Sequence, residues 1–316
     1  MAWEALGAVI GAGFASGQEL AVFFARFGPW SPLAILCALT AVFLLTRRIL
    51  AMEQTSFRRL SWRIAFTLLA VVSGGAMAAA AGEIAALTLP FSGAKYAGMA
   101  AVLALSHLCA GRNRPLFRRL CQGMTAALVG MLCLCLMLPP RRIAHPMPLP
   151  ARAAIPGAAL YGMSWAGFNL ALAAPLLARR GSTRSPAQKR RAAWLLTLSL
   201  GALLALGCAV LLRHPLEMHA PLPLVRLTGR LGRGGFLLCC CAMVLAEIST
   251  LAAALEALCA LLPPRALMAG YAAVALTALA GFGPVVSQLY PALGVLCTVL
   301  LLLPKEFALH SAQDVV

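Results

Sequence analysis

Four acidic residues lie inside long apolar stretches of this chain, where carboxylates are rare. Glu19, Glu83, Glu247 and Glu256 occupy such stretches, and no lysine or arginine lies comparably deep. Unpaired carboxylates at membrane depth mark cation or proton pathways more often than they serve structure. Glu83 and Glu256 are near the ends of their stretches, where water can reach them. Glu247 is near the middle of its stretch, so it is the strongest candidate to carry a cation or a proton.

Two hydroxyl groups accompany Glu247. Ser249 and Thr250 follow it in the same apolar stretch. Hydroxyls on a helix usually donate back to a carbonyl of the preceding turn, which is a structural role. Together with a carboxylate and with carbonyls exposed at a helix break, they would also form a hard-oxygen set suited to a small cation. The three residues are therefore candidates for ion coupling.

The first apolar stretch contains glycines and polar residues at its centre. It reads Gly11-Ala12-Gly13-Phe14-Ala15-Ser16-Gly17-Gln18-Glu19. Glycine costs up to about 1 kcal/mol relative to alanine inside a helix. Irregular backbone is tolerated at membrane depth only where protein buries it or where it lines a watery cavity. A small-residue packing face explains the glycines but not Gln18 and Glu19. The pattern predicts a helix break over residues 11–17 that faces a site.

The composition is that of an integral membrane protein built from helices. Of the 316 residues, 62% are hydrophobic and 11% charged, whereas soluble domains carry about 25% charged residues. The net charge of +17 comes from arginines in short loops, which is typical of topology signals and argues against a nucleic-acid partner. The eleven cysteines form no C-x-x-C pair, so neither a zinc site nor a disulfide framework is indicated. Ten apolar runs are long enough, or nearly so, to cross a ~30 Å hydrocarbon layer; they lie near 5–26, 31–46, 64–89, 96–110, 121–138, 154–178, 192–212, 234–262, 266–282 and 285–303.

The sixth run predicts a second break. Its centre reads Tyr161-Gly162-Met163-Ser164-Trp165-Ala166-Gly167-Phe168-Asn169, which again places glycines and polar residues in mid-span. Split five and five, the spans form two halves of opposite orientation, near 1–140 and 150–305, in a single transmembrane domain. Interrupted segments at corresponding positions of two inverted halves indicate a transporter's binding site.

The distribution of basic residues predicts the orientation. With the N-terminus in the cytoplasm, the inside loops hold 17 lysines and arginines and the outside loops hold 9. Positive charge is enriched on the cytoplasmic side of membrane proteins. Both termini are therefore expected in the cytoplasm.

A family resemblance rests on the opening motif. Residues 11–19, followed by Phe23-Phe24 and Gly28, resemble the start of the YkvI family of bacterial membrane proteins. That family is similar to the amino acid–polyamine–cation superfamily, which has the leucine-transporter fold of five plus five inverted spans and lies in the bacterial cytoplasmic membrane. In that fold the solute sits between the breaks of the first and sixth spans. The resemblance implies that the solute-binding positions are Gly13, Phe14, Ala15, Ser16, Gly17, Tyr161, Ser164, Trp165 and Asn169.

The same resemblance implies a sodium site. In such folds the ion is held by carbonyls one turn before the first break and by hydroxyls on the eighth span. The matching positions are Gly7 and Ile10 for the carbonyls and Ser249 and Thr250 for the hydroxyls. No other cofactor is implied, and the choice between Na⁺ and H⁺ stays open.

The leading functional interpretation is a cation-coupled secondary transporter for a small polar solute, most simply an amino acid or related amine. Helix N-terminal dipoles at the breaks suit a carboxylate, and the intramembrane carboxylates suit an amine or a coupling cation. The alternatives are a non-transporting sensor or scaffold of the same fold and, less favoured, an intramembrane enzyme. His214, Glu217 and His219 lack the spacing of a helical metal-ligand pair and are interpreted as part of a solvated loop. The oligomeric state is left open.

Overall fold

The computed structural model describes residues 12–53, 57, 59–109, 114–140 and 151–303, and these contain helices and no strand. Five helical segments are long and apolar enough to cross a membrane: Ala25–Ala51, Leu60–Thr88, Pro186–Arg213, Arg233–Leu261 and Phe282–Leu302. Shorter apolar helices accompany them. The described chain is thus that of an all-α membrane protein, as its composition predicts.

Helices occupy the described part of every predicted run. The first run is divided into α2 (Ala12–Ala15), α3 (Gln18–Phe23) and the 3₁₀-helix η1 (Ala25–Trp30). The next eight runs correspond to α4 (Ser31–Ala51), α5 (Leu60–Thr88), α6 (Ala94–Cys109), α7 (Arg114–Leu136), α8 (Ala151–Gly181), α9 (Pro186–Arg213), α11 (Arg233–Leu261) and α12 (Pro264–Leu279). The last run comprises α13 (Phe282–Pro284), the π-helical turn η5 (Val285–Leu289) and α14 (Tyr290–Leu302). Three short helices join α9 to α11: η3 (Glu217–His219), α10 (Pro223–Thr228) and η4 (Gly229–Leu231).

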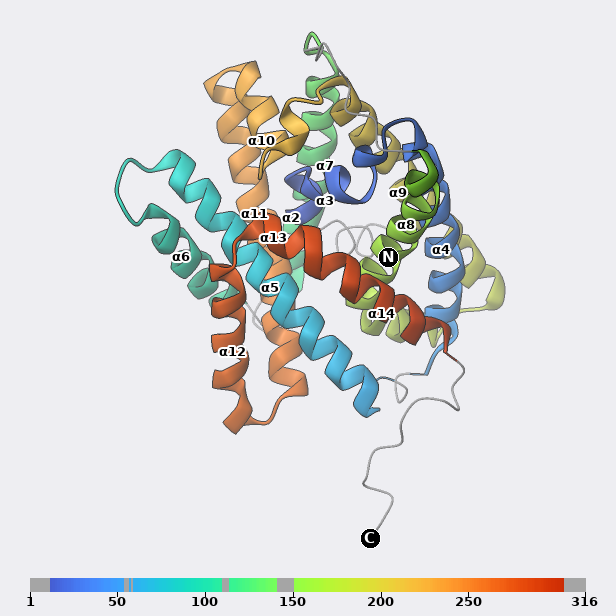
Figure 1. Ribbon diagram of the computed structural model, residues 1–316. Coiled ribbons are helices and arrows are strands. Elements are labelled where there is room, and N and C mark those ends of the chain that lie inside the picture. Colours follow the sequence, from blue (N-terminus) through green and yellow to red (C-terminus); the bar gives the residue numbers. More distant parts are fainter. Residues whose placement is uncertain (1–11, 54–56, 58, 110–113, 141–150, 304–316) are drawn as a thin grey trace.

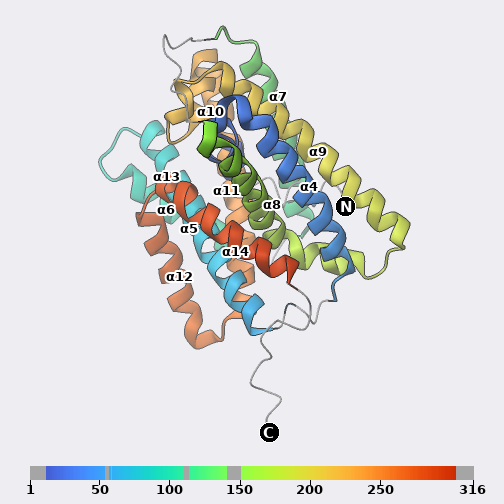
Figure 2. The same cartoon turned by 45° about the vertical axis from the view of Figure 1, so that its right-hand side comes forward.

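The long helices form two packed groups (Figures 1 and 2). In one group α8 packs against α4 and α14, and α9 packs against α4. In the other group α5 packs against α6, α11 and α12, while α11 also contacts α6 and α7. The broken first run lies between the groups, because α2 contacts α5 and α11 whereas α3 contacts α8 and α9. The break predicted from the sequence is therefore at the centre of the molecule.

Small residues allow helices to approach closely around α5, which crosses the middle of the view in Figure 1. Its segment 74–82 consists almost wholly of glycine and alanine, and its side chains are buried. A Cβ atom on Gly75 would lie 2.5 Å from Cβ of Thr277 on α12. In lipid, helix association depends on such close packing. Moving an apolar side chain from lipid to a helix interface gains little free energy, because both surroundings are apolar.

The predicted break in the sixth span is wrong, because α8 is one continuous helix from Ala151 to Gly181. Its glycines serve packing instead. A Cβ atom on Gly162 would lie 2.2 Å from the carbonyl oxygen of Ala34 on α4, and one on Gly167 would lie 1.9 Å from Oγ1 of Thr298 on α14. Asn169 donates from Nδ2 to the carbonyl of Trp165 one turn earlier, at 3.1 Å. Both glycines and the amide are thus compatible with unbroken helix.

The loops gather at two opposite ends of the molecule. At the C-terminal end, where α4, α11 and α14 end and α5 begins, Arg48 donates to the carbonyl of Leu303, and Arg63 donates to that of Leu261 at 3.0 Å. At the other end, here called the α10 end, Arg230 donates to the carbonyl of Pro139 at 2.7 Å. Each of these hydrogen bonds joins loops or helix ends that the predicted alternation of spans assigns to one side.

Candidate functional site

The helix of the first run is interrupted at Ser16 and Gly17, as predicted. Gly17 has φ of +82°, a left-handed conformation that a side chain disfavours. The Ser16 hydroxyl donates to the carbonyl of Gly13 at 2.8 Å and accepts from the backbone N–H of Gln18 at 3.0 Å. One side chain therefore satisfies backbone groups on both sides of the break, which keeps unpaired polar groups out of the apolar interior.

Glu19 places a carboxylate against this break. The residue is 2% exposed, and its Oε2 accepts a hydrogen bond of 2.9 Å from Nε1 of Trp165 on α8. Its Oε1 lies so close to Gly13 that a Cβ atom there would be 2.2 Å away. The side chain of Asn169 also interacts with this carboxylate. The structure thus brings together Gly13, Glu19, Trp165 and Asn169, which the sequence singled out from separate runs.

Two aromatic side chains, Trp165 and Tyr290, interact with the Glu19 carboxylate. Trp165 meets Phe24 edge to face, with ring centroids 5.4 Å apart. Tyr290 at the start of α14 interacts electrostatically with Glu19 and stacks on Phe168 at 4.1 Å. Sequence reasoning missed Tyr290. The signal was the polar sequence Ser287-Gln288-Leu289-Tyr290 within the last apolar run, where the helix loosens into a π-helical turn.

Tyr161 contributes to a second aromatic group nearer the α10 end. Its ring lies 5.9 Å from that of Phe23 and 5.6 Å from that of Phe27. The guanidinium of Arg26 lies 5.1 Å from the centroid of the Tyr161 ring. This residue therefore packs against the first run as expected, although it faces α3 and η1 and not the turn itself.

Ser164 does not meet the break. Its hydroxyl donates to the carbonyl of Pro291 on α14 at 2.7 Å. Successive residues of a helix point about 100° apart, so Trp165 can face the first run while its neighbour faces α14. Among the proposed solute-binding residues of α8, Trp165 and Asn169 are the two whose side chains interact with Glu19.

Glu247 is buried in α11, the helix that packs against α2. It is 0% exposed, and neither of its carboxylate oxygens has a hydrogen-bond partner among the described residues. Ser249 donates within its own helix to the carbonyl of Ala246 at 2.8 Å, and Thr250 is half-buried. The eighth predicted run thus packs against the first one.

The predicted sodium site is only partly within the described chain. Gly7 and Ile10, proposed to supply its carbonyl oxygens, lie outside the described residues. In the part of the chain that the structure describes, no group of three or more histidine, cysteine, aspartate or glutamate residues could hold a metal ion. Of the predicted sodium ligands, only the hydroxyls of Ser249 and Thr250 on α11 lie within the described residues.

Glu83 has a structural explanation. Its Oε1 forms an ion pair of 2.7 Å with Nζ of Lys95, and both side chains are partly exposed. The pair joins the end of α5 to the beginning of α6. A partly solvated ion pair of this kind holds neighbouring helices together weakly and is no signature of a transport pathway.

The segment 214–232, which contains η3, α10 and η4, covers the break from the α10 end; we call it the cap. The backbone N–H of Leu224 donates to the carbonyl of Ser16 at 2.9 Å. With its amide oriented to match, Gln18 donates to the carbonyls of Ala220 and Pro221 at 3.1 and 3.2 Å. A Cβ atom on Gly17 would lie 2.8 Å from Cγ of Leu224. The interpretation of His214 and Glu217 as part of a solvated loop is therefore wrong, because both are buried in a segment that packs on the first run, whereas His219 is exposed.

Comparison of the chain with protein-family models finds no match, and comparison with curated proteins finds none either. The resemblance to the YkvI family stays a prediction based on the opening motif.

Proposed function

We propose that the protein is a secondary active transporter for a small polar solute, most simply an amino acid or related amine. The observation that carries this proposal is the buried break at Ser16 and Gly17, which lies between two helix groups with the Glu19 carboxylate against it. Broken helices at the interface between structural repeats are where secondary transporters bind solute and ion. A packing role alone would not require a carboxylate there.

The helix contacts support a five-plus-five repeat. In such a repeat the third and eighth spans, here α5 and α11, correspond, as do the fourth and ninth, α6 and α12. The contact of α5 with α12 then has its counterpart in the contact of α11 with α6, and both occur. Likewise the contact of α11 with α7 has its counterpart in that of α5 with α14, and both occur. This reciprocity favours two related halves. The halves differ in their opening spans, because the first span is broken and the sixth is continuous.

The arrangement suits alternating access. A solute amine held near Glu19 would contact the first run and α8, while a cation near Glu247 would contact α11. The first run touches both helix groups, so movement of one group against the other would change access to the break. Bound solute or ion drives such a change only if it binds one conformation better than the other.

Uptake by purified protein tests the proposal. The full chain is reconstituted into liposomes, and accumulation of labelled amino acids and amines is measured with and without sodium or proton gradients. We expect gradient-dependent accumulation that Gly17→Leu abolishes, because the side chain would collide with Leu224 and fill the break. Gly93→Leu is the matched control, since Gly93 also has positive φ (+95°) but has no atom within 4 Å of its Cβ position.

Two results would contradict the proposal. Equal uptake by the Gly17→Leu and original proteins would show that the break does not face the solute. The other result is that no tested solute is moved by a gradient, while one of them still raises the melting temperature of the protein. That combination would favour a non-transporting sensor.

A further inference from the structure

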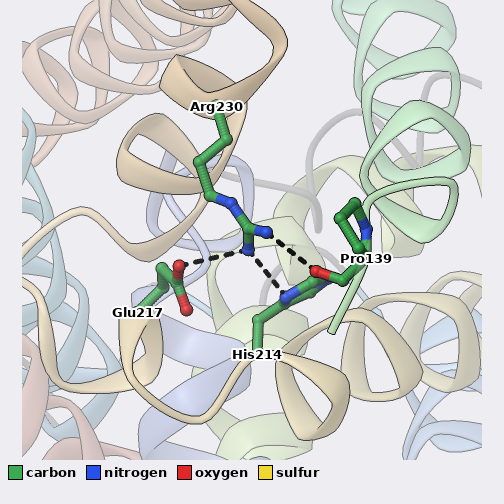
Figure 3. A network of polar contacts seen from close by, with 4 residues as sticks. All are labelled: Pro139, His214, Glu217 and Arg230. Atoms are coloured by element: carbon green, nitrogen blue, oxygen red, sulfur yellow. Dashed lines mark hydrogen bonds and ion pairs between the residues drawn. The ribbon is translucent and has the colours of Figure 1, made fainter. Parts of the chain in front are cut away.

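A buried cluster of polar side chains holds the cap at the α10 end (Figure 3). The guanidinium of Arg230 lies 3.1 Å from Nδ1 of His214, 3.3 Å from Oε1 of Glu217 and 2.7 Å from the carbonyl oxygen of Pro139. His214 is 0% exposed and Glu217 is 3% exposed. Their remaining atoms, Nε2 and Oε2, have no hydrogen-bond partner among the described residues. One arginine therefore joins the end of α9, η3 and the end of α7.

The contact between Arg230 and His214 requires a neutral imidazole. Arginine can only donate hydrogen bonds and keeps its charge at all physiological pH values. Nδ1 of His214 must therefore accept, which it can do only when it carries no proton. A proton on Nδ1 would replace an attractive hydrogen bond by two opposed N–H groups and two like charges in a buried position.

The charged surroundings act in both directions on His214. Burial lowers the pKa of His214, and the positive charges of Arg230 and, more weakly, Arg213 lower it further. The Glu217 carboxylate and the backbone carbonyl of Cys135 on α7 act in the opposite direction. The net result is a lowered pKa, so the closed arrangement favours the neutral ring.

The residues of the cluster flank, along the chain, the part of the cap that covers the break. Ala220 and Leu224, which contact Gln18 and Ser16, lie in the chain between Glu217 and Arg230. His214 and Glu217 anchor one side of this stretch and Arg230 anchors the other. Loss of the Arg230–His214 contact would leave the longer Arg230–Glu217 ion pair, at 3.3 Å, to hold the two anchors together, with a second positive charge beside it.

We propose that His214 is an acid-sensitive latch, whose protonation releases the cap and opens the break at Ser16 and Gly17 to solution at the α10 end. This latch does not depend on the proposed transport function, because a sensor would use it equally well. The contribution of the latch to the closed state is complete above the ordinary histidine pKa of 6.5. It is lost as the pH falls from that value towards the lower pKa of the closed state. Each unit of difference between the two pKa values changes the opening equilibrium by about tenfold.

Thiol accessibility in the full chain tests this latch without any transport measurement. In protein whose native cysteines have been replaced, a single cysteine is introduced by Ala220→Cys, at a cap position that is 6% exposed. A second protein carries Leu216→Cys, at a position that is 49% exposed. The rate of modification by a water-soluble maleimide is measured in detergent from pH 8 to pH 5.5. The rate for Ala220→Cys is divided by the rate for Leu216→Cys. This ratio cancels the dependence of thiol reactivity on pH that the two proteins share.

We expect the ratio to rise by up to about tenfold towards pH 5.5, because that pH lies one unit below the ordinary histidine pKa of 6.5. His214→Asn should keep it constant and low, because the Asn carbonyl accepts from Arg230 without titrating. His219→Asn is the matched control, since His219 is exposed in the same segment, and it should keep the rise. Arg230→Gln should give a high ratio already at pH 8.

Three results would overturn the latch. The ratio in the otherwise unchanged protein could stay flat, or it could fall in acid because protonated His214 pairs with Glu217. The rise could also persist in His214→Asn. If His214→Asn does not fold, as judged by gel filtration, a low ratio at pH 8 in Arg230→Gln contradicts the latch independently.

Discussion

Two buried carboxyl groups have opposite surroundings in this molecule. Glu19 accepts a hydrogen bond from Trp165 and fits against Gly13, so its position is held by the fold. Glu247 is equally buried, but both of its oxygens lack a partner among the described residues. A carboxyl group without a partner in an apolar interior is stable only when it carries a proton or binds a cation. This difference makes Glu247 the better candidate for coupling and Glu19 the better candidate for solute contact.

Variants of Glu247, Ser249 and Thr250 separate the two candidate coupling ions, H⁺ and Na⁺. If Glu247 carries a proton, Glu247→Gln should remove the pH dependence of uptake and leave little response to sodium. If sodium binds at the hydroxyls, Ser249→Ala combined with Thr250→Ala should weaken the sodium dependence and largely spare the pH dependence. Uptake into proteoliposomes under separate sodium and proton gradients measures both. Unchanged ion dependence in both variants would show that these polar residues are structural.

At the scale of elements, glycine has two different effects in the first run and in α8. Gly17 has positive φ and ends a helical turn, whereas Gly162 lies within regular helix and allows α4 to approach. The local sequences look alike because both combine glycines with polar residues. Their neighbours also differ, since the backbone of α4 lies against Gly162 whereas Pro223 and Leu224 at the start of α10 lie against Gly17.

This distinction predicts opposite effects of alanine on stability. Gly162→Ala should lower the melting temperature, because its Cβ would lie 2.2 Å from the carbonyl oxygen of Ala34 and push α4 away from α8. Gly130→Ala in α7 should leave it unchanged or raise it, because nothing lies within 4 Å of that Cβ position and alanine is favoured over glycine in a helix by about 1 kcal/mol. Thermal unfolding in detergent measures both. A similar decrease in the two variants would mean that the close contact between α4 and α8 does not limit stability.

At the scale of the whole molecule, different loops and helix ends meet at the α10 end and at the C-terminal end. Helices run between the α10 end and the C-terminal end, and contacts such as that of Arg63 with Leu261 connect segments far apart in sequence at one end. The excess of basic residues in alternate loops predicts that the C-terminal end faces the cytoplasm. The cap would then close the break from the outside.

Cysteine labelling in intact cells tests this orientation. In a background freed of native cysteines, Ser182→Cys and Arg265→Cys should be protected from a membrane-impermeant maleimide. Phe91→Cys and Leu216→Cys should react. All four positions are exposed, so differences in labelling report the side of the membrane. Labelling of Ser182→Cys and Phe91→Cys from the same side would contradict the alternation of spans, and complete reversal would contradict only the orientation.

The amino-acid sequence by itself determined where the helices lie and where the first run is interrupted. Hydropathy depends on the side chains of one continuous stretch, so every predicted run contains a helix. The break at Gly17 is also local, because three glycines and Ser16 lie within a few residues of one another. Glu19 and Trp165 could be singled out individually for the same reason, as polar groups in apolar surroundings.

Only the tertiary structure decided what those residues face. It showed that α8 is continuous, that Ser164 faces α14, and that Tyr290 belongs beside Glu19. It also placed the cap, including His214, over the break. The physical reason is that the direction of a side chain around its helix, and the partner it meets, depend on packing between segments distant in the chain. Composition, hydropathy and local spacing carry no information about those partners.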